Sequence, residues 1–180
     1  MPSVFISPSL QEFNPYIDGG NEEYYMNLIA DELIPYLTAS GITVGRNSPE
    51  QTLSQAINQS NQGNYDLHLA LHSNASPPTI AGQLRGTDVY YNPLSQQGQR
   101  AANIIADNFK AIYPNPNAVK ALPTTTLAEL NRTTAPAVLI EIAYHDNRED
   151  AQFIRDNISE IARNLALSVT EFFDIPLVEP

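Results

Sequence analysis

Leu67, Leu69 and Leu71 alternate with other residues, and this period of two predicts a β-strand. The intervening positions carry no acidic or basic side chain other than His68, which favours a strand buried on both faces, as in a parallel sheet. Ligand sites of such sheets lie beyond the carboxyl ends of the strands, where His72 is found. His68 lies four residues earlier, roughly 13 Å away at about 3.3 Å per residue, so the two cannot chelate one ion. We expect His72 to be functional and His68 to be a hydrogen-bonded core residue.

Other apolar runs complete an alternation of strands and helices. Short apolar runs predict strands at residues 4–6, 42–44 and 137–143. Residues 83–91 predict a further strand, which is a candidate for an edge of the sheet. Helical spacing predicts helices from a cap at residue 21 to 41, from a capping box at 48–51, over 95–112, and in a C-terminal region after 146 or 147. Pro35 predicts a kink or a restart of the first helix. Residues 114–126 predict a long irregular loop. We therefore expect a single α/β domain over residues 1–180, with a mostly parallel twisted sheet and helices on both faces.

Composition restricts the functions open to this chain. Its net charge of −11 argues against binding nucleic acid through bulk electrostatics, and no apolar stretch is long enough to span a membrane. Without cysteine it has no disulfide, thiolate ligand or cysteine nucleophile. The start of the sequence has neither a basic region nor an apolar region of the signal-peptide type, so we expect no signal peptide here.

Two glutamates are candidates for chemistry. Glu141 interrupts the apolar run 137–143, where an ionised carboxylate is costly unless it is paired or coordinated. It is either a strand-end residue that reaches solvent or a helix N-terminus, or a general base beside a metal. Glu23 is either an ordinary partner of the helix dipole or a residue at the same sheet edge as His72.

Four stretches resemble one family, the zinc-dependent N-acetylmuramoyl-L-alanine amidases of the cell-wall type. Tyr65–Ala75 is similar to a strand written D-L-F-I-S-I-H-A-N-A, whose histidine binds zinc, and Pro136–Asn147 is similar to P-A-V-L-V-E-x-G-F-x-S-N, which holds the catalytic glutamate. The segment from Glu23 to Leu28 resembles the one that opens with a zinc-ligating glutamate. Gly86–Tyr91 resembles the G-x-x-x-Y strand that follows the histidine.

The resemblance implies roles for particular residues. Glu23 and His72 would be zinc ligands, Glu141 the general base that activates a zinc-bound water, and Asn74 and Arg132 would help to bind the substrate. The family's first ligand is a histidine in D-P-G-H-G-G, but here the stretch reads Ser-Pro-Ser-Leu-Gln-Glu from residue 7 to 12.

Aligning the prolines places Leu10, which cannot bind a metal, at that histidine. Gln11 or Glu12 is then the candidate oxygen ligand, and we take Gln11 as the first choice. Ala56 lies near the place of the family's arginine on the second helix.

The resemblance implies hydrolysis of the amide between the lactyl group of N-acetylmuramic acid and L-alanine in peptidoglycan. Zinc would be the cofactor, a peptidoglycan fragment the substrate, and the cell wall or cell exterior the place of action. The alternative is a metal-free module of the same fold that binds peptidoglycan or regulates its turnover, and Leu10 favours it. A nucleotide-binding protein ranks lower, because no glycine-rich loop follows the first strand.

Overall fold

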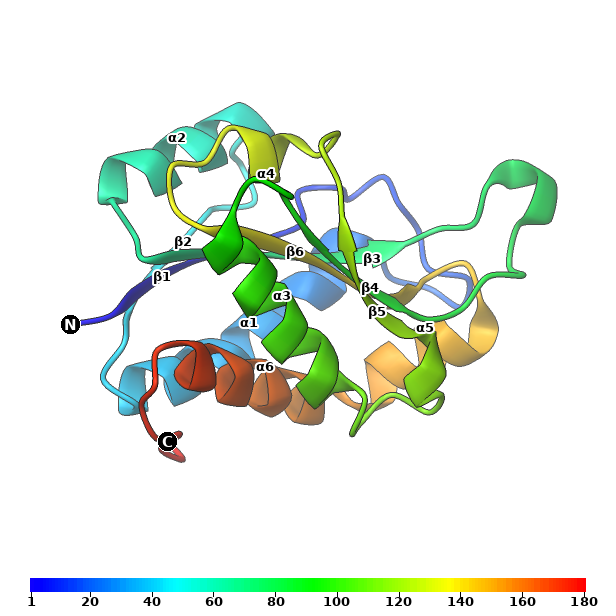
Figure 1. The fold of residues 1–180 in the computed structure, drawn as a ribbon. Coiled ribbons are helices and arrows are strands. Elements are labelled where there is room, and N and C mark those ends of the chain that lie inside the picture. The colour runs from blue at the N-terminus through cyan, green and yellow to red at the C-terminus, as the bar shows by residue number, and fades with distance from the viewer.

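A twisted six-stranded sheet forms the centre of the computed structural model, which describes residues 1–180 (Figure 1). The strand order is β2-β1-β3-β6-β4-β5. The first four in this order are parallel to one another, and β4 and β5 run in the opposite direction. The strands are β1 (Ser3–Pro8), β2 (Thr43–Arg46), β3 (Leu67–Asn74), β4 (Thr87–Tyr91), β5 (Val119–Pro123) and β6 (Ala137–Tyr144).

Helices cover both faces of this sheet, which confirms the predicted α/β architecture. One face carries α1 (Glu22–Ala39), α3 (Gln96–Phe109), α5 (Arg148–Asp156) and α6 (Ile158–Phe172). The other carries α2 (Leu53–Gly63) and the short α4 (Ala128–Asn131), and 3-10 turns occur at Pro78–Ile80 and Pro116–Ala118. No helix combines the length and the apolar character that a membrane span requires.

The two faces differ greatly in the size of their hydrophobic cores. The core beneath α1, α3, α5 and α6 contains 34 buried residues, including Leu67, Leu69 and Leu71. The core beneath α2 and α4 contains four: Ala70, Leu130, Ala137 and Leu139. Since alternate residues of a strand share a face, His68 and His72 lie with Ala70 on the thinly covered side. This face therefore has room for polar groups.

Several predicted boundaries were wrong. The strand predicted at 83–91 is only β4, and it is an inner strand, because residues 119–123 of the predicted loop form the edge strand β5. The second helix begins after the N-cap Thr52, whose capping-box partner is Gln55, and not at 48–51. The first helix continues through Pro35 to Ala39 without a restart. Pro35 has no N–H to donate to the carbonyl of Asp31, so α1 lacks this one hydrogen bond and otherwise continues.

Candidate active site

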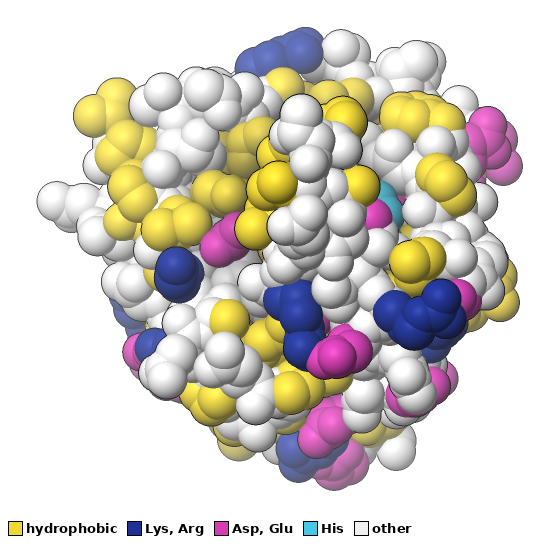
Figure 2. All heavy atoms as spheres, turned by 90° about the vertical axis from the view of Figure 1, so that its right-hand side faces the viewer, with side chains coloured by type: hydrophobic (Ala, Val, Ile, Leu, Met, Phe, Trp, Pro, Cys, Tyr) yellow, Lys and Arg dark blue, Asp and Glu magenta, His cyan; other side chains and the backbone are white.

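His72 and Glu141 lie side by side at the carboxyl end of the two central strands. They are register partners in the β3–β6 pairing, directly before an irregularity between His72 and Asn74. Both belong to the face under α2 and α4, and both line one cavity of about 490 Å³. Figure 2 looks onto this edge of the sheet, and a histidine and an acidic side chain are visible in a hollow among hydrophobic and uncharged side chains. The placement agrees with the site edge expected from the sequence.

The carboxylate that contacts His72 from α1 belongs to Glu22 and not to Glu23. Glu22 Oε1 lies 2.9 Å from His72 Nδ1, and Glu22 is 1% exposed. Glu22 occurs four residues before the buried Met26, which places it on the buried stripe of the helix, whereas Glu23 is turned about 100° away and is only half-buried. The carboxylate beside His72 is therefore that of Glu22, one residue before the predicted Glu23.

Because Glu22 is buried and paired and Glu23 is not, their replacement by alanine should lower the free energy of unfolding by different amounts. We expect Glu22→Ala to lower the free energy of unfolding by about 2 kcal/mol, because it removes a buried hydrogen bond between charged groups while Glu129 still pairs with His72. Glu23→Ala, the matched control, should change it by less than about 0.5 kcal/mol. Urea unfolding of both variants measures the contrast, and equal losses would contradict the assignment.

Glu129 is the site residue that the sequence did not indicate. Its carboxylate joins the two histidines of β3: Oε2 lies 2.7 Å from His68 Nε2, and Oε1 lies 3.1 Å from His72 Nε2. The residue is 4% exposed, on α4. The remaining nitrogen of His68, Nδ1, lies 2.9 Å from the hydroxyl of Ser60, which confirms His68 as a hydrogen-bonded core residue. One carboxylate therefore links a core histidine to the histidine of the cavity.

The two carboxylates around His72 determine its charge. Burial lowers the pKa of His72, but the hydrogen bonds with Glu129 and Glu22 outweigh it and raise the pKa to about 10. Burial raises the pKa values of Glu22 and Glu129 as well, yet their hydrogen bonds to histidine bring both below the ordinary range of a glutamate. At neutral pH His72 is consequently an imidazolium that donates one N–H to each carboxylate.

Glu141 lies in a different electrostatic environment from these paired carboxylates. Its Oε2 is buried and has no hydrogen-bond partner in the protein. Burial, together with the negative charges of Glu22 and Asp88, outweighs the attraction of His72 and raises its pKa to about 7. A carboxylate with a pKa near the working pH is suited to general base chemistry.

Gln11 reaches the site from the loop after β1. Its Nε2 lies 3.4 Å from His72 Nδ1, while its Oε1 accepts a hydrogen bond from Asn14 Nδ2 at 2.9 Å. Asn14 Nδ2 also donates to Glu22 Oε2 at 2.8 Å. Because an ionised carboxylate only accepts hydrogen bonds, Asn14 must present its NH₂ group here, and this fixes Gln11 with its amide nitrogen toward His72.

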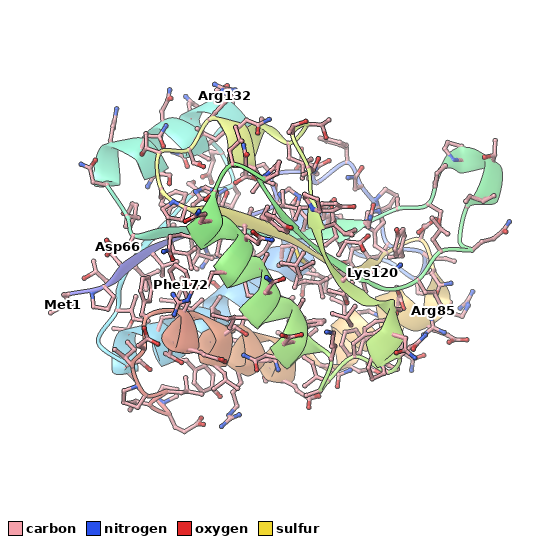
Figure 3. The ribbon with its side chains drawn as sticks, viewed as in Figure 1. Met1, Asp66, Arg85, Lys120, Arg132 and Phe172 are labelled. Atoms are coloured by element: carbon pink, nitrogen blue, oxygen red, sulfur yellow. The ribbon has the colours of Figure 1, made fainter.

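The two remaining predicted residues lie outside the cavity lining. Asn74 is half-buried at the end of β3, where its Oδ1 accepts a hydrogen bond from the backbone N–H of Ala75. Arg132 is exposed on the outer side of α4 and α2, and its guanidinium donates to Ser54 Oγ (Figure 3). Leu53, the residue before Ser54, lines the cavity, so Arg132 is close to the rim of the cavity.

The donor groups do not fit a three-ligand zinc site. His72 and Glu22 are suitable in type, but Leu10 has no donor atom and Gln11 presents a nitrogen that carries two hydrogens. No three histidine, aspartate or glutamate side chains converge to hold a metal ion. His72 would also have to give up its hydrogen bond to Glu22 or Glu129 before that nitrogen could bind a metal. The oxygen ligand expected from Gln11 is therefore not presented.

Comparison with known proteins identifies the family. The family model described as N-acetylmuramoyl-L-alanine amidase matches residues 12–171. No curated protein sequence matches. The fold is similar to that of the amidase AmiC2 of Nostoc punctiforme (TM-score 0.83, 17% identity, 96% of this chain and 97% of that chain) and the catalytic domain of the amidase CwlV of Paenibacillus polymyxa (0.83, 19%, 98% and 100%). It is also similar to the catalytic domain of the CD27L endolysin, which targets Clostridia difficile (0.77, 25%, 95% and 98%). The chain belongs to the N-acetylmuramoyl-L-alanine amidase family, a class of peptidoglycan hydrolases.

Proposed function

We propose that the cavity at the carboxyl ends of β3 and β6 hydrolyses the amide between the lactyl group of N-acetylmuramic acid and L-alanine. The observation that carries the proposal is Glu141, a buried and unpaired carboxylate with a pKa of about 7 that lines this cavity. A module that only binds has no use for so costly a group. The family supplies the substrate class, and action at the cell wall follows from that substrate.

The reaction requires two proton transfers, and we assign both to Glu141. It takes a proton from a water molecule while the water oxygen attacks the amide carbonyl carbon. It then delivers this proton to the amide nitrogen as the carbon–nitrogen bond breaks. The products are the lactyl carboxylic acid and a peptide with a free L-alanine amino group, so one water is consumed. No step is assigned to the zinc expected from the resemblance, because the donor groups do not fit it.

The cavity walls suit an uncharged amide. Its 14 lining residues include no lysine or arginine, and Leu10, Phe13 and Leu53 give it an apolar side. Phe13 is 73% exposed, so its ring is accessible to a molecule bound in the cavity. We propose that this side contacts the lactyl methyl group and the apolar face of the sugar. Asn74 and Arg132 stay proposed contacts for the more distant peptide or sugar groups.

The test is incubation of a soluble N-acetylmuramoyl-peptide with the purified protein, followed by mass spectrometry. We expect a peptide with an N-terminal L-alanine and an intact N-acetylmuramic acid. Binding of the fragment without cleavage would favour the second candidate, a peptidoglycan-binding module of the amidase fold. The missing third metal ligand is the observation that supports this second candidate.

The pH dependence of the reaction should report Glu141. A general base must be ionised, so we expect kcat/KM to increase with pH through about 7 and then to level off. Asp88, the register partner of Glu141 on β4, raises the pKa of Glu141 by its negative charge. Asp88→Asn should accordingly shift the rise of kcat/KM to lower pH. An unchanged profile in this variant would contradict the assignment of the titration to Glu141.

A further inference from the structure

The amide of Gln11 has hydrogens that no protein group uses. Its Oε1 is held by Asn14, so the NH₂ end is directed toward His72 and the cavity that Gln11 lines. The only hydrogen-bond partner of Nε2 is His72 Nδ1, at 3.4 Å. His72 Nδ1 could accept at most one of the two amide hydrogens of Gln11. When it carries a proton and donates it to Glu22, it accepts neither. At least one N–H of Gln11 therefore lacks an acceptor.

This free donor lies in the cavity that also contains Glu141. Gln11 follows Leu10, the residue that stands at the family's first metal ligand, and both residues line the cavity with Glu141. Amide hydrolysis needs a group that stabilises the negative charge developing on the carbonyl oxygen. His72 cannot provide a hydrogen bond for this purpose, because both of its nitrogens contact carboxylates.

We infer that the side-chain amide of Gln11 donates a hydrogen bond to the carbonyl oxygen of the scissile amide and thereby replaces the metal ion as electrophile. Asn14 is then a positioning residue: it binds Gln11 Oε1 and is itself fixed by the carboxylate of Glu22. Glu22, Asn14 and Gln11 form one chain of hydrogen bonds that ends in the free N–H groups. The inference rests on the proposed amide hydrolysis, and it makes this reaction independent of metal.

The first test measures metal and activity on the same preparation. We expect purified wild-type protein to contain far less than one zinc per chain by elemental analysis, and to keep its hydrolytic activity after exhaustive dialysis against a chelator. Leu10→His restores a donor at the family's ligand position and should bind zinc at least tenfold more tightly than wild type in a calorimetric titration. Stoichiometric zinc in wild type, or equal zinc affinity of the two proteins, would overturn the inference.

The second test measures the hydrogen bond. Gln11→Ala should lower kcat by about 10²–10³-fold and change KM only a few-fold, because the bond strengthens in the transition state. Asn14→Leu should lower kcat less, since Gln11 keeps its donor but loses its orientation. Gln62→Ala, on the exposed side of α2 and outside the cavity lining, is the control and should leave kcat unchanged.

The outcomes distinguish failure of the proposed function from failure of the role of Gln11. Wild type without any cleavage would remove the proposed function itself. Cleavage that is lost on chelation and restored by zinc would leave the function in place and overturn the role of Gln11. Full activity of Gln11→Ala would overturn it as well.

Discussion

Replacement of Glu141 by glutamine is expected to lower kcat for amide hydrolysis by about 10²–10⁴-fold, which is the usual contribution of a general base. Glutamine has nearly the same shape and cannot accept the proton of the attacking water. Steady-state kinetics with a soluble N-acetylmuramoyl-peptide measures the loss. KM should change little, because the carboxylate acts on water and not on the bound substrate.

Stability distinguishes a lost base from a lost fold. The pKa of Glu141 is raised in the folded protein, so ionisation of this group opposes folding at pH values above its ordinary pKa. Glu141→Gln removes this penalty, and we expect its melting temperature at pH 8 to be no lower than that of wild type. Glu160→Gln, on the exposed side of α6, is the control for both measurements. Activity retained within tenfold in Glu141→Gln would contradict the role of Glu141.

Replacement of Glu129 by alanine is expected to lower the free energy of unfolding by about 3–5 kcal/mol, the range for breaking a buried ion pair. The change leaves Nε2 of both His68 and His72 without its carboxylate partner, and His68 is completely buried. It also removes the largest contribution that raises the pKa of His72. Urea unfolding at pH 7 measures the loss.

Two further variants show that the loss comes from unpaired histidines. In Glu129→Gln, the amide oxygen can accept a hydrogen bond from one imidazole, and the amide NH₂ can donate to the other imidazole when its Nε2 carries no proton. We therefore expect a smaller loss than for alanine. His68→Phe introduces the residue that the family motif has at this position, and it removes one of the two stranded groups. The double variant His68→Phe/Glu129→Ala should therefore lose less than the sum of the single variants. Strict additivity would contradict the bridging role of Glu129.

The fold was predictable to the extent that periodicity determines it. The alternation of Leu67, Leu69 and Leu71 correctly identified a central buried strand, and the run 137–143 identified the second. The edge strand β5 was missed because an edge strand buries few side chains: only Val119 in it is fully buried. Without a clear hydrophobic pattern in the strand, the prolines and threonines of the surrounding residues 114–126 indicated a loop.

The candidate site was predictable where residues lie on regular elements. His72 and Glu141 could be placed at one edge because parallel strands bring their carboxyl ends together. Glu22 could have been chosen over Glu23 from its spacing to Met26 and Leu33 on the buried stripe of α1. Glu129 could not, since α4 has one turn and a single glutamate in it has no periodic context. Only the folded chain shows that its carboxylate joins two histidines.

Hydrolysis in water enriched in ¹⁸O is the most direct test of the central claim, that this cavity cleaves the lactyl amide of peptidoglycan through a water activated by Glu141. The reaction places the oxygen of water on the acyl carbon. We therefore predict one ¹⁸O atom in the lactyl carboxylate of the released N-acetylmuramic acid and none in the peptide, with wild type and not with Glu141→Gln. Uncleaved substrate after prolonged incubation with wild type, or ¹⁸O in the peptide, would contradict the account.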